Sequence, residues 1–491
     1  MNDFVVSLLL LGAISSNDNL NQMPFWATTD QFGVMPESNG ALALLRAGTS
    51  FDESRTFQWR WGTSLGFRSD WMGEKVLIDE LNASLRYRKL RLDLGMIHPE
   101  QDFMASDATL GTLSVTGGNF MMSGNARTLP GYALRLEPWD VPFTNGHLQL
   151  YGRFGDYSTL GKRYMQGALV HNTALYARIK AGEHLSFTAG FDHYSLWAGS
   201  NPEQGVQPHS FLDYLRVLTG SSGGSDASLG DQVNSLGDHR GRELLRVDYK
   251  ADSWSVCFQH DIPYDDRSGM IFRNFPDGVN TLCFSFSDKS RWVSDIVYEY
   301  HYTLNQSGDC ERRLATEAEI ASGSKRLYLA PYDGKYYMIV GGADNYCNNF
   351  AYRSGWSAFT RQLGNPLFYS RYIASPDDPA GYIMQGTGNN MLQAHHFAVS
   401  GSLFRKIPYR LVATYSLNYG CYFDAEGRYN RELVLDKPLK QFSAGLNAMI
   451  PCLKGALHII PGIYFDQGEL LSNCFGATLS LKYNLLNNKQ I

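Results

Sequence analysis

Residues 344 to 356 bring together the types of side chain that bind sugars. The stretch carries a carboxylate, several amides, a guanidinium and aromatic rings, supplied by Asp344, Asn345, Tyr346, Asn348, Asn349, Tyr352, Arg353 and Trp356. Planar amides and carboxylates make paired hydrogen bonds to adjacent sugar hydroxyls, and rings cover the apolar C–H faces. We therefore predict a glycan-binding site here, with Tyr346 and Trp356 stacked on sugar rings. A structural interpretation competes with it, because Asn and Asp also form turns and these residues could fill an interior.

A second group of residues could attract an acidic glycan. It consists of Arg312, Arg313, Lys325 and Arg326. The whole chain has 43 Lys and Arg against 48 Asp and Glu, a formal net charge of −5, so any attraction for an anion has to be local. A solvated charged loop is the simpler interpretation of these four residues. The lack of a basic excess also argues against nucleic acid as a partner.

Signatures of catalysis or metal binding are missing from the sequence. It has no P-loop, GxSxG, HExxH or GxGxxG motif, and its acidic pairs Asp265–Asp266 and Asp377–Asp378 are typical of solvated turns. His239 lies in the stretch DHRGRE, but no Ser follows at a usable distance on the same predicted strand. We expect no enzymatic activity, no metal and no cofactor.

The seven cysteines lie far apart, with no CxxC and no His at zinc-ligand spacing. Their number is odd, so at least one thiol stays unpaired. We expect them to be small side chains within strands and loops rather than a disulfide scaffold.

Composition narrows the class of protein. Only 19% of the 491 residues are charged, 13% are aromatic, and the mean hydropathy is −0.28. The longest apolar run, from Phe4 to Ile14, is shorter than the roughly 18 residues that a spanning helix needs. We interpret Phe4 to Leu11 as a first β-strand in a chain numbered without its signal peptide; a weak uncleaved signal is the alternative. The chain has few charges, many Tyr and Gly, and no spanning helix. The class of membrane protein that fits this composition is a closed transmembrane β-barrel.

Alternation with a period of two residues is the dominant pattern, and it is clearest near the C-terminus. From residue 475 to 485 one face carries only apolar or aromatic side chains, whereas the other is small or polar: Phe475, Ala477, Leu479, Leu481, Tyr483 and Leu485 oppose Gly476, Thr478, Ser480, Lys482 and Asn484. Similar alternation recurs around residues 148–154, 254–261, 281–287, 295–302, 396–403 and 409–419. Long strands with an apolar outer face are what a membrane-crossing barrel requires, since only a closed sheet satisfies its backbone in lipid. A soluble β-sandwich also alternates and is the competing fold.

Three regions interrupt the alternation, near residues 99–146, 199–238 and 309–390. The second contains a predicted helix from His209 to Thr219, with Leu and Phe at helical spacing and Gly220 at its end. We find no internal repeat and no linker, so we predict a single all-β domain over residues 1–491 with three inserts.

The segment GGADNYCNNFAYRSGWSAFTRQLGNPL at 341–367 resembles the Wzi-type capsule assembly family of outer-membrane proteins. Further stretches agree in order and spacing, so that the resemblance covers nearly the whole chain: PFWATTDQFG at 24–33, SGNARTLPG at 123–131, VPFTNGHLQLYGRFGDY at 141–157, FLDYLRVLTG at 211–220, 237–270 and FPDGVNTLCFSF at 275–286. It implies an outer-membrane β-barrel of roughly 16–18 strands with a helical insert. The seven cysteines and the polar tail ending in Ile491 depart from the family pattern.

The function implied by the resemblance is attachment of capsular or other surface polysaccharide: a lectin-like, non-catalytic anchor in contact with outer-membrane lipid. Weak contacts to a repetitive glycan could add through effective concentration, without a deep pocket. The alternative is an outer-membrane porin or transporter for small solutes, since a barrel of this size can enclose an aqueous lumen. The sequence does not name the glycan or indicate an oligomeric state.

Overall fold

The computed structural model describes the chain from residue 4 to 487, apart from 17–21, 71–74, 101–108, 202, 234, 266–269, 271, 308–310, 323–326, 331–332, 341–343, 376–377, 425–429 and 472. No helix in these described ranges is long and apolar enough to cross a membrane.

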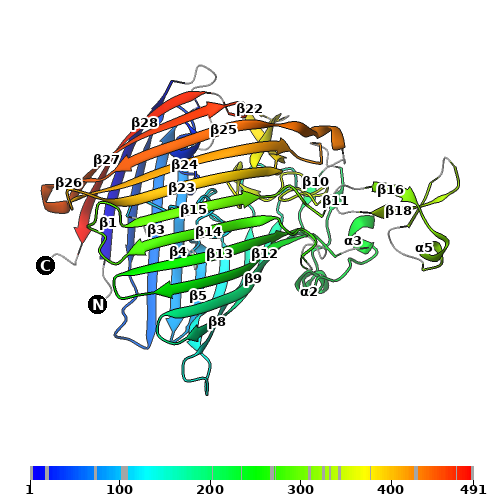
Figure 1. Cartoon of the computed structure of the whole chain (residues 1–491), viewed down its shortest axis with the longest axis horizontal. Coiled ribbons are helices and arrows are strands. Elements are labelled where there is room, and N and C mark those ends of the chain that lie inside the picture. The colour runs from blue at the N-terminus through cyan, green and yellow to red at the C-terminus, as the bar shows by residue number, and fades with distance from the viewer. Residues whose placement is uncertain are drawn as a thin grey trace.

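The chain forms a closed antiparallel β-barrel (Figure 1), as the alternation predicts. Its wall has 18 strand positions in the described chain, which is within the expected range. We count β25 and the short β26 as one position, because both pair with β27. Closure is made by β1, which pairs with β28 from Val5–Asn487 to Ser15–Gly476. The wall strands are β1 (Phe4–Ser15), β2 (Gly40–Thr49), β3 (Phe57–Ser69), β4 (Val76–Tyr87), β5 (Leu90–Met96), β6 (Gly131–Asp140), β7 (Leu148–Ser158), β8 (Leu169–Ala181), β9 (Leu185–Trp197), β12 (Asp238–Lys250), β13 (Trp254–Tyr264), β14 (Gly278–Phe286), β15 (Asp295–Tyr302), β23 (Leu392–Leu403), β24 (Ile407–Gly420), β25 (Val434–Ala448) with β26 (Ile450–Cys452), β27 (Leu457–Gly468) and β28 (Cys474–Asn487).

The wall confirms the predicted faces of the last strand. Phe475, Leu479 and Leu481 are 50%, 54% and 39% exposed, whereas Thr478 and Ser480 between them are buried. Lys482 pairs with Leu9 and lies on the same inner face as Ser480. Exposed large apolar side chains recur on the other wall strands, as expected for a surface that contacts lipid.

Two of the cysteines are bonded to each other, which their spacing along the chain did not indicate. Cys257 on β13 lies directly opposite Cys283 on β14, and the two form a disulfide with a Cα–Cα distance of 5.2 Å. Adjacent strands bring the Cβ atoms of directly opposed residues within bridging distance, a relation that spacing along the chain does not reveal. Cys347, Cys452 and Cys474 carry free thiols, and Cys310 lies outside the described residues.

The two ends of the barrel differ. Both termini and the short turns lie at one end, which we call the inner end, and the long connections lie at the other, the outer end (Figure 1). The long connections carry β10 (Ser200–Asn201), β11 (Gly205–Val206), α2 (Phe211–Thr219), α3 (Leu229–Val233), β16 (Glu311–Leu314), α5 (Glu317–Ala321), β17 (Leu327–Leu329) and β18 (Tyr336–Val340). Outer-membrane barrels have short periplasmic turns and long extracellular loops, so the outer end corresponds to the cell surface.

The inserts differ from their predicted limits in one respect. The first leaves the wall after Met96 and returns at Gly131, so residues 131–140 of the predicted 99–146 insert are the wall strand β6. The helix predicted at His209–Thr219 is confirmed as α2, which begins after the N-cap Ser210 and ends at Gly220 with φ +60°.

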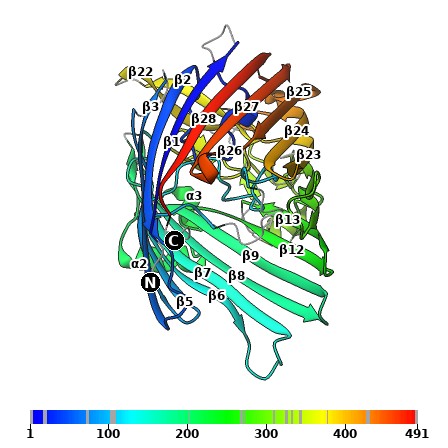
Figure 2. The same cartoon turned by 90° about the vertical axis from the view of Figure 1, so that its left-hand side faces the viewer.

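Three segments enter the barrel and meet in one apolar core, which we call the plug (Figure 2). They are 23–35 with α1 (Phe25–Thr28), residues 109–130, and residues 344–368 with β19 (Ser357–Ala358) and β20 (Arg361–Gln362); the hairpin β21 (Tyr369–Ser375) and β22 (Asp378–Asn389) follows. Trp26, Phe120, Trp356 and Phe368 are almost fully buried in this core. Inward residues from many parts of the wall join it: Leu11, Leu42, Val170, Tyr194, Cys257, Val279, Val297, Ala394, Val412 and Tyr464. A continuous apolar core therefore lies inside the barrel and contacts the wall at many points around it.

Polar side chains of the wall hold the plug in place. Glu299 on β15 accepts hydrogen bonds from the Ser114 hydroxyl at 2.5 Å and the Val115 amide at 2.8 Å. Arg242 on β12 donates to the Gly118 carbonyl at 2.7 Å and pairs with Asp261 at the same distance. These wall charges therefore satisfy backbone groups of residues 109–130 that would otherwise be buried without partners.

Candidate functional site

The predicted glycan segment at 344–356 lies in the plug toward the outer end, and its rings are buried. Tyr346, Tyr352 and Trp356 are 0%, 3% and 1% exposed. The Trp356 indole donates to the Met121 carbonyl at 2.5 Å, and the Tyr346 hydroxyl donates to Asp277 at 2.8 Å. In this structure none of the three rings presents a face that a sugar can cover.

The polar members of the segment are engaged within the protein. Asn345 Oδ1 accepts hydrogen bonds from the side-chain amides of Asn348 at 2.8 Å and Asn390 at 2.9 Å. Asn349 Oδ1 accepts from two following backbone amides, and Asp344 accepts from the Ser307 hydroxyl. These are the turn-forming contacts of the structural interpretation, so the geometry favours a scaffold role for the amides.

Burial changes the acidity of the groups around this segment. Asp277 accepts hydrogen bonds from two backbone amides and from Tyr346, yet its burial raises its pKa to about 6. Burial likewise raises the pKa of the Cys347 thiol, so this cysteine is not poised as a thiolate.

A partly exposed patch adjoins the buried segment. Phe350 is 58% exposed, and the Arg353 guanidinium lies 5.6 Å from the centre of its ring and 4.6 Å from that of Tyr164. Arg353 pairs with Glu203 at 2.8 Å. We call Tyr164, Glu203, Phe350 and Arg353 the Phe350 patch. Of these, only Arg353 is among the residues predicted from the sequence. Phe350 lies in the same segment but was not singled out, and Tyr164 and Glu203 come from separate loops.

Of the four basic residues predicted to attract an acidic glycan, the structure describes the side chain of Arg313 alone. Arg313, on β16 in the three-stranded sheet that projects from the outer end, pairs with Glu319 at 2.7 Å. Arg312 precedes it on the same strand, and Lys325 and Arg326 lie outside the described residues. The pairing of Arg313 with a carboxylate agrees with the simpler interpretation of a solvated charged loop for that residue.

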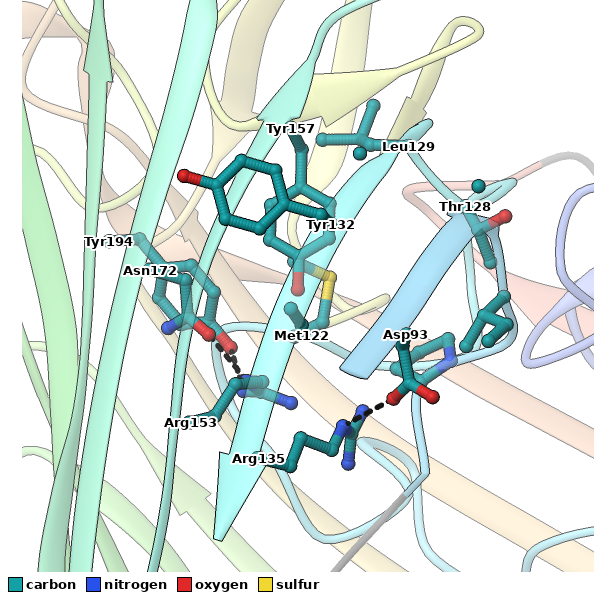
Figure 3. A pocket seen from close by; sticks show the side chains of 15 residues that line it. Asp93, Met122, Thr128, Leu129, Tyr132, Arg135, Arg153, Tyr157, Asn172 and Tyr194 are labelled. Atoms are coloured by element: carbon teal, nitrogen blue, oxygen red, sulfur yellow. Dashed lines mark hydrogen bonds and ion pairs between the residues drawn. The ribbon is translucent and has the colours of Figure 1, made fainter. Parts of the chain in front are cut away.

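A cavity of about 60 Å³ lies between residues 122–129 of the plug and the wall strands β5 to β9 (Figure 3). Tyr157 and Tyr194 line it together with Met122, and most of its lining is apolar. Several of its polar groups are paired with one another: Arg153 donates to Asn172 and Tyr194, and Arg135 pairs with Asp93. The space suits about four or five waters. It could not be predicted from the sequence, because its lining comes from the plug and from five wall strands.

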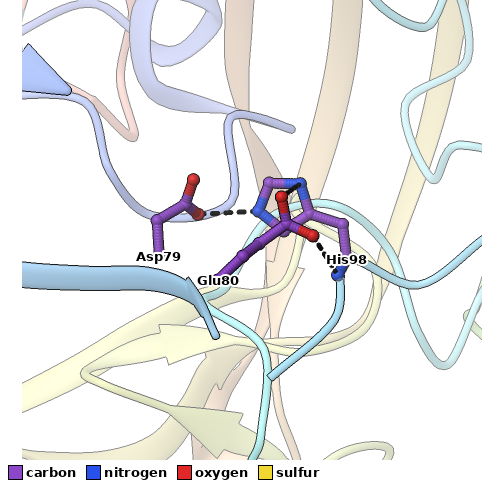
Figure 4. Close-up of side chains that lie close together, drawn as sticks. All are labelled: Asp79, Glu80 and His98. Carbon is purple, nitrogen blue, oxygen red and sulfur yellow. Dashed lines mark hydrogen bonds and ion pairs between the residues drawn. The ribbon is translucent and has the colours of Figure 1, made fainter. Parts of the chain in front are cut away.

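Asp79, Glu80 and His98 form the one group of three metal-type ligands found in the described chain (Figure 4). Asp79 already contacts His98 at 2.6 Å, the Ser64 hydroxyl at 2.8 Å and Arg46 at 3.3 Å. The His98 ring stacks on Phe32 with 3.6 Å between centroids. The nearby guanidinium of Arg46 opposes a cation. The contacts instead fasten His98 to the wall, and His98 in turn stacks on Phe32 of the plug.

The structure also places a Ser beside His239, from the neighbouring strand rather than the same one. The Ser195 hydroxyl on β9 lies 2.9 Å from His239 Nδ1, and His193 Nε2 lies 2.9 Å from the same nitrogen. Ser195 is 0% exposed and His239 is 8% exposed. A buried hydroxyl shared between two imidazoles has no room for a substrate, so we assign the cluster to packing.

Neither protein-family models nor curated protein sequences give a match to this chain. Among solved structures it is similar to Wzi, an Escherichia coli outer-membrane protein involved in group 1 capsule assembly and described as a carbohydrate-binding β-barrel: the TM-score is 0.54 and the identity 10%, over 97% of this chain and 83% of that chain. Pseudomonas aeruginosa OpdO also matches, with a TM-score of 0.47 and 11% identity over 99% of this chain and 97% of that chain. Acinetobacter baumannii OccAB4 matches with a TM-score of 0.46 and 8% identity over 98% and 97%. At such identities the likeness concerns the fold, and this chain is a closed β-barrel of the outer-membrane type.

Proposed function

We propose that this barrel binds capsular or another surface polysaccharide at the cell surface, as a non-catalytic anchor. The plug is the observation that carries the proposal. A core that contacts the wall around the barrel leaves the outer loops as the surface available to a large ligand. The fold-level similarity to a carbohydrate-binding barrel, Wzi, supports the same function.

Within this proposal the segment 344–356 acts in two parts. The buried rings Tyr346, Tyr352 and Trp356 hold the plug, while the half-buried Asn349 and the Phe350 patch face the outside. The Phe350 ring would cover a sugar face, and Arg353 with Glu203 would bind hydroxyl groups. Each contact is weak alone, but a repetitive glycan can occupy many copies of the protein at once.

The test is capsule retention, scored as cell-bound against shed polysaccharide in cells that lack the protein and carry variants of it. Phe350→Ala should shift polysaccharide from the cell-bound to the shed fraction while the barrel still resists unfolding in detergent. Phe143→Ala is the matched control, because Phe143 is equally a solvent-exposed Phe, 102% exposed, in a turn at the inner end. Equal retention in both variants would remove the Phe350 patch from the proposed site, and full retention without the protein would refute the function.

The alternative remains a channel for small solutes. Conductance of the purified protein in planar bilayers separates the two functions. The plug inside the barrel predicts small currents or none, whereas large stable currents would support a porin and contradict the anchor as the sole function.

A further inference from the structure

Helix α2 is amphipathic in the opposite sense to a helix of a soluble protein. Its apolar face points away from the barrel: Phe211, Leu212 and Leu215 are 76%, 57% and 41% exposed. The face against the protein carries Val217 and the charged Asp213, which is 3% exposed. Asp213 caps the helix through Ser210 and pairs with Arg216 at 2.6 Å. In water this arrangement would leave a stripe of large apolar side chains uncovered.

The helix is fixed to the outer wall of the barrel near the outer end (Figure 1). The Tyr214 hydroxyl donates to Asp156 at 2.8 Å, and Asp156 also contacts His171 at 2.9 Å. Asp156 on β7 is paired with His171 on β8, and both alternate with inward-facing neighbours such as Tyr157 and Asn172. They therefore lie on the outward face, where α2 covers them; His171 is only 1% exposed.

The apolar outer surface of the barrel ends next to these contacts, on their side toward the inner end. Two residues before Asp156, Phe154 points outward and is 38% exposed, and its ring lies 4.8 Å from that of His171. Leu175 and Phe191 on the next strands are also exposed on this outward face. Two residues along a strand span about 7 Å, so α2 stands at the level where the lipid-facing band ends.

We infer that α2 is an interfacial helix whose Phe211, Leu212 and Leu215 enter the acyl region of the outer leaflet. A short helix with its apolar face in the headgroup boundary and its polar face against protein is stable there, because burial in lipid removes the apolar stripe from water. The occupant is lipid because the stripe continues the apolar surface of the barrel. This assignment does not depend on the proposed glycan function. It gives the loop between β9 and β12 a fixed height above the membrane.

The test uses a photoreactive side chain in the full-length protein. Phe211 and Leu215 are replaced, one at a time, by p-benzoylphenylalanine, and the barrel is reconstituted in dimyristoyl phosphatidylcholine vesicles and irradiated. Phe191, on the outward face of β9, is the lipid-facing control. Leu314, 55% exposed on the projecting β16, is the matched control in water. Each barrel is first checked for heat-modifiable mobility, and Leu212 provides a third site if one of the two variants does not fold.

We expect phospholipid adducts at positions 211 and 215 in a yield comparable to that at position 191. The yield at position 314 should be at least fivefold lower. Yields at 211 and 215 as low as at 314 would place the helix in water and overturn the inference. Adducts between two copies of the chain would also overturn it, because the apolar face would then be a protein–protein interface.

Discussion

Replacing Trp356 by Ala should loosen the plug and leave the wall intact. Trp356 is 1% exposed, packs 5.2 Å from the Tyr194 ring on β9, and supplies the hydrogen bond to the Met121 carbonyl. Truncating a buried aromatic side chain to Ala costs about 3–5 kcal/mol of stability. The Met121 carbonyl would also lose its hydrogen-bond donor while buried, so we expect the upper part of that range. The population of the opened plug should then rise by about a hundredfold to several thousandfold.

Hydrogen exchange in detergent micelles measures this change. Amides of residues 344–356 and 119–123 should lose protection in Trp356→Ala, whereas wall amides such as those of β28 should keep theirs. Trp292→Ala is the control, because this Trp is 71% exposed and its loss removes no core contact. Phe350→Ala should reduce glycan retention with protection unchanged.

A particular combination of results would refute the reasoning. If Trp356→Ala loses polysaccharide while its plug amides stay fully protected, the indole contacts the glycan itself, as the residue types in the sequence predict. The burial in the structure would then not represent the state that binds.

Three further predictions concern the wall, the plug and pH. Leu481→Arg should destabilise the barrel by about 2–4 kcal/mol if position 481 lies near the bilayer midplane, and so lower the yield of barrel folded in lipid. Lys482→Arg on the inner face should leave this yield unchanged. Heat-modifiable mobility after folding into vesicles measures the yield of both variants. Arg242→Ala should lower the stability by about 3–5 kcal/mol and expose residues 109–130 to protease, because it leaves Asp261 buried without its cation, although Asp192 keeps its ion pair with Arg153. Arg313→Ala on the surface should change the stability little. The pKa of Asp277 is about 6 in the folded state against 3.8 for an ordinary Asp, so the folded state binds the proton more tightly and the plug should gain about 1 kcal/mol as the pH falls from 7 to 5. Opening free energies from hydrogen exchange of residues 344–356 would show this gain, and Asp277→Asn should abolish it; greater stability at pH 7 would contradict the sign.

The wall could be predicted from the sequence because a strand that faces lipid on one side and protein on the other has to alternate. The face assigned to Leu481 and that assigned to Ser480 follow from this period alone. Helix α2 was predictable for a similar local reason, since Ser210 and Gly220 mark its ends. The direction of its apolar face was not, because nothing local says which side meets the barrel.

The candidate site was predicted less completely. The residue types at 344–356 fit a sugar site and a buried turn equally well, and the choice depends on burial, which Trp356 acquires from Met121 and Tyr194 at distant positions in the chain. The Phe350 patch is likewise assembled from three loops. The same limit explains the disulfide: Cys257 and Cys283 are opposed by strand register, which depends on the whole sheet.

The pairing of β1 with β28 constrains the order of assembly. Until the last strand is in place, β1 has a free edge along the apolar run Val5–Leu11, which is a template for pairing with another chain. The three plug segments belong to connections made earlier in the sequence, so they are available to pack before the last strand forms. If the seam between first and last strands closed first, they would have to enter through the outer end of a finished barrel, and we therefore expect the seam to close after the plug has packed.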